Sequence, residues 1–454
     1  MVAESARMQG LRELRRVRRR SRDEPERQNL LDERGRLVAR RAAQQAGGAG
    51  PSVSDSIRTD QALTLTRELD RVESRLRELD PDRSAESSPS SLQSVQDALS
   101  PGQLLVSFYL GDDRSAAWVI RPDGARVVRL PAAHTLASDV SSLLESLRHP
   151  RQAMGGIARL SEALRQVLVE PYLRELSDAR ELLIQADGAL HSLPFAVLLA
   201  VEGTDPLPLS RVLSAVMGSP DTDVDRTGRS LLLVADPAWS GEPSAPSPFP
   251  DQSLLASLIR DRGIGELPGT RREAEAIAAL VGESSQVQMK LGARASREYI
   301  VGGGMVGHDL IHLATHGLVD LEYPSLSALL LAGEDSLGPA FLRPHDIAEL
   351  EVAAELVVLS GCETGRGRIL AGSGALSLAR PFHIAGARRV LASLWKVDDH
   401  RTALLMEHFY RHLLIDGRSA PEALARAQAA LRKDRATAHP YYWAGFVLSV
   451  DPSG

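Results

Sequence analysis

Short apolar runs alternate with helical periodicity through the second half of the chain. The runs that predict strands are RSLLLVAD (229–236), QVQMKL (286–291), DLIHLAT (309–315), ELVVLSG (355–361), RRVLASLW (388–395) and the closing WAGFVLSV (443–450). The segments that predict helices lie between them, at 272–281, 296–304, 345–350, 374–386, 401–415 and 421–433. Strands this apolar, separated by helices, indicate a mostly parallel sheet with helices on both faces. We therefore expect an α/β fold over residues 228–454.

The pattern before residue 228 predicts a three-stranded antiparallel run, then a helical region, then a short buried strand. These elements are 103–109, 115–121, 125–130, 135–176 and 181–188, the last of which ends in an Asp-Gly turn. We expect a small accessory subdomain, antiparallel in part, over residues 96–227.

Charged residues dominate residues 1–95, which we expect to form a helical extension and a linker. Residues 59–79 repeat an apolar residue at helical spacing among alternating charges, which indicates an amphipathic or coiled-coil helix. Residues 1–45 are rich in arginine, and two interpretations stay open: a surface for nucleic acid or an acidic partner, or a solvated helix. The Gly/Pro/Ser-rich segment 46–55 and the Ser-rich segment 84–94 indicate flexible connections.

Composition and charge exclude several classes of protein. The net charge of -6 gives no indication of nucleic-acid binding, and no run of about 18 apolar residues could span a bilayer. The basic N-terminus lacks the apolar region of a secretory signal, so we expect a cytoplasmic protein without membrane insertion. The chain has one cysteine, which excludes an internal disulfide and a thiolate metal site.

That cysteine, Cys362, and the histidine His316 each follow the carboxyl end of a predicted central strand, and each adjoins a glycine, Gly361 or Gly317. Parallel sheets place their sites beyond these strand ends, so the two residues should converge. A thiol needs a nearby base to become a thiolate at neutral pH, and His316 can be that base. Small residues allow substrate to approach backbone N–H donors, and we expect the N–H groups of Gly317 and Cys362 to form an oxyanion hole.

Alternatives stay open for each residue alone: Cys362 as a small buried hydrophobe, His316 as a satisfied strand-end histidine. Other chemistries find less support. His312 and His316 lie four residues apart without the HExxH pattern of a zinc site. The glycine-rich runs at 301–305 and 365–374 lack the Gly-Lys-Ser/Thr of a phosphate loop, and there is no Gly-x-Ser-x-Gly elbow. We expect no cofactor and no metal.

Motifs over roughly residues 100–450 are similar to those of the CHAT domain family, caspase-like cysteine peptidases that are related to separase. The matching motifs are ADGALHSLPFAVL (186–198), LPGTRREAEAI (267–277), HLATHG (312–317), LSGCETG (359–365), GSGALSLARPFHIAGARRVLASLWKVDD (372–399) and YYWAGFVL (441–448). The resemblance implies a caspase-like fold, with His316 and Cys362 as the catalytic pair. His316 precedes Cys362 by 46 positions, close to the spacing of about 50 that is typical of caspases.

The resemblance also implies a residue that sets specificity. In separase-like relatives, an aspartate after the LWKVDD-type tryptophan receives the basic side chain before the cut, and Asp399 matches it best, with Asp398 as the neighbouring candidate. A buried carboxylate can select arginine through bidentate hydrogen bonds. Either aspartate could instead cap the helix that follows. We expect Asp187 and His191 to form a turn and a wall of the site, and assign no third catalytic residue.

The sequence thus predicts a caspase-like cysteine endopeptidase that cleaves protein substrates after Arg or Lys. Family members often follow tetratricopeptide repeats, whereas here the charged helical segment 1–80 stands in their place. The resemblance implies activation by a protein partner through that segment or by processing, and a role in bacterial defence or cell death. Two alternatives stay open: a catalytically silent scaffold that binds partners through 1–80, and a cysteine hydrolase of small amides.

Overall fold

A computed structural model of the protein describes residue 33 and residues 91–200, 205–212, 229–238, 268–281, 286–319, 327–333, 339–364, 376–395 and 397–450. The chain divides into two compact units, residues 1–89 with 242–265, and residues 90–241 with 266–454. The helical extension expected over 1–80 lies outside the described residues, apart from Glu33 in a helical conformation. No helix within the described ranges is long and apolar enough to cross a membrane.

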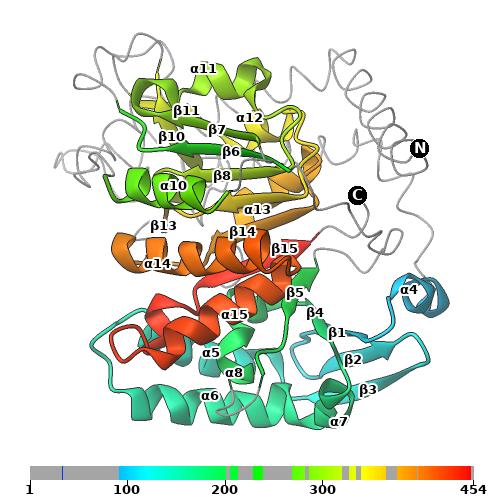
Figure 1. Ribbon diagram of the computed structural model, residues 1–454. Coiled ribbons are helices and arrows are strands. Elements are labelled where there is room, and N and C mark those ends of the chain that lie inside the picture. Colours follow the sequence, from blue (N-terminus) through cyan, green and yellow to red (C-terminus); the bar gives the residue numbers. More distant parts are fainter. Residues whose placement is uncertain are drawn as a thin grey trace, which may run out of the picture. The chain divides into compact units, whose positions relative to one another are not determined.

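The second unit is built on one eleven-stranded sheet (Figure 1). In spatial order the strands are β3 (Gly124–Leu130), β2 (Ser115–Arg121), β1 (Gln103–Tyr109), β4 (Glu181–Gln185), β5 (Leu209–Val212), β15 (Phe446–Val450), β14 (Arg389–Ser393), β12 (Leu356–Leu359), β8 (Leu310–Ala314), β6 (Ser230–Ala235) and β7 (Gln286–Leu291). The expected antiparallel strands and the expected parallel strands therefore belong to the same sheet.

Two parallel groups of strands run in opposite directions and meet at one antiparallel pair. Strands β7, β6, β8, β12 and β14 are mutually parallel. Strands β15, β5, β4 and β1 are parallel to one another, and β15 runs antiparallel to β14. The β1–β2–β3 end is antiparallel. The expectation of a mostly parallel sheet with a small antiparallel part is confirmed.

Helices and short helical turns pack around the sheet (Figure 1). The α-helices are α4 (Leu92–Ala98), α5 (Ala133–Leu147), α6 (Met154–Leu168), α7 (Leu173–Ser177), α8 (Phe195–Leu199), α10 (Pro268–Leu280), α11 (Arg297–Tyr299), α12 (Pro344–Ala348), α13 (Leu376–Ile384), α14 (Asp399–Tyr410) and α15 (Ala420–Lys433). The shorter helical turns are η2 (Glu170–Tyr172), η3 (Gly188–Ser192), η4 (Gly292–Arg294), η5 (Ile300–Gly304), η8 (Arg411–Ile415) and η9 (Pro440–Tyr442).

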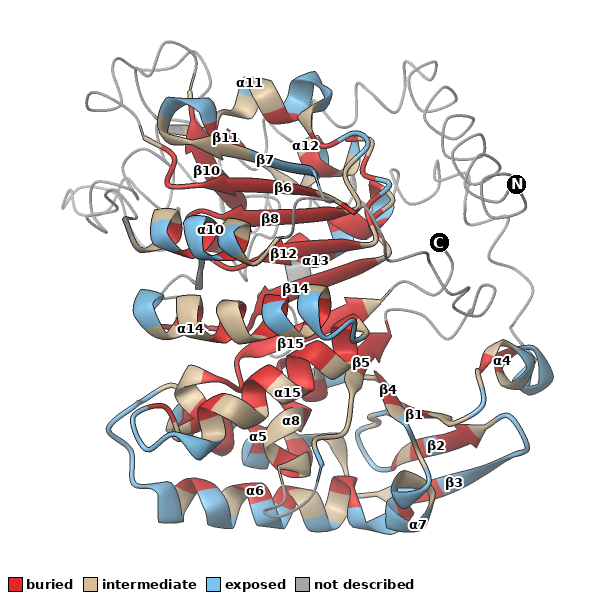
Figure 2. Cartoon of the chain, viewed as in Figure 1, coloured by how far each residue is buried: buried red, intermediate tan, exposed pale blue. Residues whose placement is uncertain are grey.

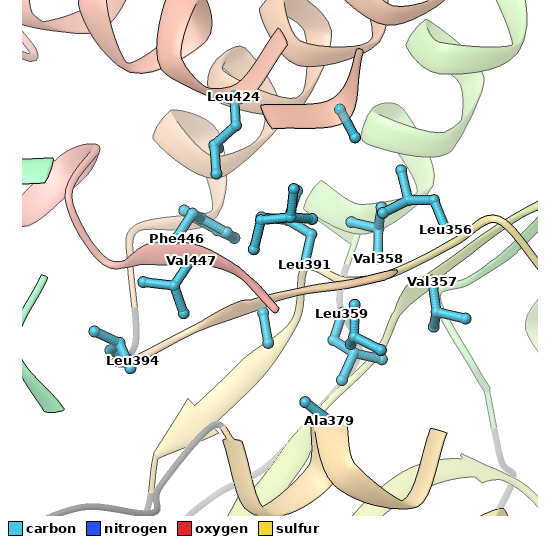
Figure 3. Packing of buried hydrophobic residues seen from close by; sticks show 14 of the residues in the cluster. Leu356, Val357, Val358, Leu359, Ala379, Leu391, Leu394, Leu424, Phe446 and Val447 are labelled. Carbon is cyan, nitrogen blue, oxygen red and sulfur yellow. The ribbon is translucent and has the colours of Figure 1, made fainter. Parts of the chain in front are cut away.

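The core strands are buried on both faces, as their largely apolar composition predicts. Every residue of β8, β12 and β14 is buried, whereas the edge strand β7 is exposed over its first half (Figure 2). Figure 3 shows Leu424 of α15 on one side of these strands and Ala379 of α13 on the other. Alternate residues of β12 point to the two sides, because side chains alternate along a strand. Helices therefore cover both faces.

Two parts of the fold differ from the sequence-based expectation. The Ser-rich segment 84–94, expected to be flexible, ends inside helix α4, because the Ser91 side chain accepts the Ser94 N–H and caps it. A second, four-stranded sheet was not predicted. Its order is β11 (Pro339–Leu342), β10 (Ala328–Ala332), β9 (Gly317–Val319) and β13 (Cys362–Thr364). Strands β9 and β13 are too short to show any periodicity, so only their pairing identifies them.

We predict that the folded state loses stability as the pH falls below the ordinary imidazole pKa of about 6.5. Burial is the main cause that lowers the pKa of four histidines, His191, His308, His408 and His439. Because their folded-state pKa values are depressed, the unfolded chain binds more protons in this window, and stability rises with pH. The thermal midpoint, measured from about pH 8 to about pH 5, should therefore fall on acidification.

A variant with His408 replaced by glutamine provides a matched control for this prediction, because it removes one of the four titrating groups. Its midpoint should depend less steeply on pH than that of the natural chain. A midpoint that rises on acidification would contradict the burial of neutral imidazoles.

Candidate active site

The carboxyl ends of β8 and β12 lie side by side at one edge of the large sheet. Leu313 of β8 is opposite Leu359 of β12 in the parallel register. Just past the strands, the Ser360 N–H donates to the Leu313 carbonyl over 3.2 Å. The segments that carry His316 and Cys362 therefore leave the sheet together.

The two segments stay paired beyond the large sheet, where they become strands β9 and β13. Cys362 lies opposite Gly317 in this parallel pair, and the Gly317 N–H donates to the Gly361 carbonyl over 3.0 Å. Of Cys362 itself, the structure describes the backbone. This pairing brings the backbone of the only cysteine next to the residue that follows His316.

The segment that carries His316 contains one residue more than the segment it faces. Leu359 and Cys362 are three positions apart, whereas their partners Leu313 and Gly317 are four positions apart. An extra residue on one strand interrupts the regular ladder, as in a β-bulge. His316 lies within this interruption.

Backbone contacts to strand β10 anchor His316. Its carbonyl accepts the Leu330 N–H over 2.8 Å, and the hydroxyl of Thr315 donates to the Leu330 carbonyl. The histidine is 5% exposed and Thr315 is 1% exposed. The anchoring therefore fixes the backbone of the expected base between the two sheets.

Gly361 occupies a position where no larger residue fits. A Cβ built there would lie 2.0 Å from the Thr315 carbonyl oxygen and 2.7 Å from the Thr315 carbonyl carbon. Both atoms belong to the backbone and cannot turn away. The glycine before the cysteine is therefore required because the two chain segments approach closely, beyond the access for substrate that the sequence suggested.

The two N–H groups that we expected to form the oxyanion hole differ in their surroundings. The Gly317 N–H is already engaged by the Gly361 carbonyl. In a parallel ladder, the backbone groups that bond to Gly317 belong to the residues before and after Cys362. The N–H of Cys362 itself is therefore directed away from β9. On that side β13 has no strand neighbour within the described residues.

Asp398 and Asp399 both lie at the exposed N-terminus of α14. The Asp398 carboxylate accepts the Arg401 N–H over 3.2 Å and caps the helix, as one of the two interpretations predicted. Asp399 lies in the first turn of α14, close to Gly269: a Cβ built on Gly269 would be 3.1 Å from the Asp399 Cβ. Neither carboxylate is buried, in contrast to the buried pocket that we expected.

The first turn of α10, within the LPGTRREAEAI motif, reaches the same edge of the sheet. Besides Gly269 beside Asp399, the Thr270 hydroxyl accepts the Asp236 N–H over 3.0 Å. The Arg271 guanidinium holds the Asp236 carboxylate with Nε and Nη2 each 2.8 Å from Oδ2. The motif thus connects the loop after β6 with the start of α14.

Asp236 is a buried acid at the same edge of the sheet, and the sequence did not single it out. It follows β6, the strand beside β8, and is 7% exposed. Its φ of 49° lies in the left-handed region, which non-glycine residues seldom adopt. The available signal was an acid directly after an apolar strand, the same context that identified His316 and Cys362.

The ADGALHSLP segment forms the turn that was expected. It does not form a wall of the site, because β4 runs opposite to β8 and β12 and its carboxyl end lies at the other edge of the sheet. The Asp187 carboxylate accepts the N–H groups of Leu110 and Gly188, over 2.7 and 2.9 Å, and starts the turn η3. The His191 carbonyl accepts a hydrogen bond from the Arg211 guanidinium. Burial, followed by the charge of Arg211, lowers the pKa of the His191 imidazole.

Across the described ranges, no group of three or more His, Cys, Asp or Glu side chains could hold a metal ion. The fold and the site define an α/β protein with a histidine and a cysteine at the carboxyl edge of parallel strands. The CHAT domain family model matches residues 158–451. The chain belongs to the CHAT domain family, as its motifs suggested.

Curated relatives and solved structures show more distant similarity. Tetratricopeptide repeat protein 28 of Homo sapiens is 26% identical over 302 residues, and that of Mus musculus is 25% identical over 302 residues. Each match covers 59% of this chain but 12% of the relative's length. The separase–securin complex of Saccharomyces cerevisiae aligns with a TM-score of 0.46 at 10% identity, over 91% of this chain and 33% of that one. The Arg-specific cysteine proteinase gingipain R aligns with a TM-score of 0.40 at 11% identity, over 70% of this chain and 74% of that one.

Proposed function

We propose that this chain is a cysteine endopeptidase that cleaves protein substrates after a basic residue, with His316 and Cys362 as its catalytic pair. The observation that carries the proposal is the pairing of the Cys362 backbone with Gly317, the residue after His316. A base and a thiol at neighbouring strand ends suit nucleophilic acyl transfer.

The proposed reaction passes through an acyl-enzyme. His316 accepts the thiol proton, and the Cys362 sulfur bonds to the scissile carbonyl carbon, whose oxygen becomes an oxyanion. The C–N bond then breaks while the imidazolium returns its proton to the leaving amine, which leaves a thioester. A water molecule, deprotonated by His316, attacks the thioester, releases the new carboxyl end and restores the thiol.

Stabilisation of the oxyanion falls mainly to the Cys362 N–H in this proposal. That group is directed away from β9, whereas the Gly317 N–H is engaged by Gly361. Gly317 becomes a second donor only if substrate displaces the Gly361 carbonyl. One well-placed donor contributes about 3 kcal/mol to the stabilisation of a transition state.

Asp399 is the proposed partner of the basic side chain. Asp399 matches the family's specificity position best, and it lies in the first turn of α14 beside Gly269 of the LPGTRREAEAI motif. Replacing Asp399 with alanine should reduce the preference for an arginine reporter peptide over a neutral one by about 10- to 100-fold, because a charged hydrogen bond is lost. The measurement is kcat/KM of the full chain for both peptides.

Asp398→Ala is the matched control for this prediction. It should lower stability by about 1 kcal/mol through loss of the helix cap, and leave the preference for arginine unchanged. If Asp399→Ala keeps the preference, Asp399 is not the specificity residue. A loss in Asp236→Asn instead would assign the role to the acid after β6.

The proposal also covers how the peptidase is activated and where it acts. Segment 1–80 is charged and helical in pattern, which suits binding of an activating protein partner, or processing, before the peptidase acts. Membership of the CHAT domain family supports a role in bacterial defence or cell death, with the cytoplasm as the proposed location. Addition of candidate partners to the full chain, with reporter cleavage as the readout, tests this part.

A further inference from the structure

Four buried polar side chains from four elements meet behind the candidate active site. They are Glu273 of α10, His312 of β8, Ser360 after β12 and Tyr410 of α14, and none is more than 7% exposed. The His312 imidazole is at their centre. Its Nε2 lies 3.0 Å from Glu273 Oε1 and 3.2 Å from the Ser360 hydroxyl, and its Nδ1 lies 3.1 Å from the Tyr410 hydroxyl.

This cluster is costly to bury. An ionised carboxylate loses several kcal/mol of hydration in a protein interior unless it is paired. Within the described residues, Glu273 Oε1 accepts no hydrogen bond, and its ion-pair contact is with His312 Nε2 at 3.0 Å. Burial, with a contribution from the Glu273 charge, raises the pKa of Tyr410, which keeps its phenol protonated as a donor for Nδ1. The His312 ring is therefore held from both of its nitrogens.

The cluster also joins the two segments of the site. His312 is on the strand that leads to His316, four residues earlier, and Ser360 precedes Cys362 by two residues. Ser360 is tied to β8 twice, by its N–H to the Leu313 carbonyl and by its hydroxyl to the His312 ring. A shift of His312 would therefore move the turn that presents Cys362.

We propose that Glu273 and His312 are positioning residues that hold the Ser360–Gly361–Cys362 turn in register with His316. The proposal rests on the proposed thiol chemistry but not on proteolysis. Glu273 orients the imidazole through Nε2, and the imidazole fixes Ser360. Loss of either contact leaves the pair present but less well aligned, which lowers the reactivity of the Cys362 thiolate.

The test uses the chain's single cysteine, because alkylation by iodoacetamide then reports on Cys362 alone. The rate is measured across pH for the full chain and for Glu273→Gln, which keeps the size of the side chain and removes its charge. We expect the rate near neutral pH to fall about tenfold, and the midpoint of the profile to move to higher pH, because alignment with His316 is lost. Removal of a negative charge alone would favour the thiolate, so a fall distinguishes geometry from a direct field effect.

Glu355→Gln is the matched control. Glu355 is also a largely buried acid, paired with Arg229 over 2.8 Å, but it precedes β12 at the opposite edge of the sheet. It should lower stability and change the alkylation rate by no more than about twofold, since distant sites act independently. Equal falls in the two variants, or a rate in Glu273→Gln that is unchanged or higher, would overturn the proposal.

Ser360→Ala keeps the test decisive if Glu273→Gln does not fold, because it removes one hydroxyl only. It should reproduce part of the fall, and an unaltered rate would count against the proposal. In the double variant the two effects should be less than additive, since both act through His312. If the natural chain cleaves no peptide but shows this pattern of alkylation rates, the positioning proposal stands and the peptidase proposal fails.

Discussion

Replacing Cys362 with alanine is expected to reduce cleavage of an arginine reporter peptide by a factor on the order of 10³ or more. The substitution removes the only thiol of the chain, and no other residue can form the thioester. The measurement is kcat/KM for the full chain, with its activating partner where one is required. The KM should change much less than kcat, because substrate binding does not depend on the nucleophile.

A natural chain and a Cys362→Ala variant that cleave the reporter at the same rate would exclude Cys362 as the nucleophile. Cys362→Ser is a useful companion, because it keeps the shape of the side chain and loses the easily ionised thiol. It should be almost as inactive as the alanine variant, while both variants unfold at about the midpoint of the natural chain.

Gly361→Ala is expected to have the second largest effect. The added Cβ would lie 2.0 Å from the Thr315 carbonyl oxygen, so either the turn before Cys362 or the segment before His316 has to move. Because the clashing atoms are backbone atoms, strain of this kind costs about 3 kcal/mol of stability, the upper end of the usual range. In molecules that still fold, kcat/KM should fall about 100-fold, because small misplacements of reacting groups are costly.

Gly124→Ala serves as the matched glycine control, since a Cβ at that position meets nothing within 4 Å. It should leave both stability and activity unchanged. A Gly361→Ala variant with the stability and activity of the natural chain would contradict the close approach of the two segments.

The strands of the large sheet could be predicted because their burial is visible in the sequence. Residues 309–315 and 355–361 are mostly apolar, and they contain β8 and β12, which are buried on both faces. Strands β9 and β13 could not be predicted, because three residues show no period and their order depends on pairing across the chain. Strand β5 was also missed, because its four residues are too few to show a period. Only its pairing with β4 and β15 identifies it.

The part of the site that could be predicted is the part that follows the ends of predicted strands. The contexts of His316 and Cys362 indicated their convergence, and the backbone register of β9 and β13 brings their segments together. The engagement of the Gly317 N–H depends on a hydrogen bond to Gly361 that no local pattern reveals. The capping of α14 by Asp398 was visible as one of two alternatives, because a cap is a local feature.

Contacts that support the site were the least predictable. Glu273 reaches His312 across the helix–sheet interface, and Asp236 meets Arg271 at the start of the same helix. Both pairs join residues that are distant in the sequence. The LPGTRREAEAI motif signals the importance of α10, but only the fold shows which residues it contacts.

The pH dependence of alkylation at Cys362 is the sharpest test of the His316–Cys362 pair, because it needs neither a substrate nor a partner. We expect the thiol of the natural chain to titrate well below the ordinary pKa of about 8.5, since His316 stabilises the thiolate. In His316→Ala the midpoint should return to about 8.5. If the Cys362 thiol of the natural chain titrates at or above that value, and its midpoint is unchanged in His316→Ala, the assignment of the pair is contradicted.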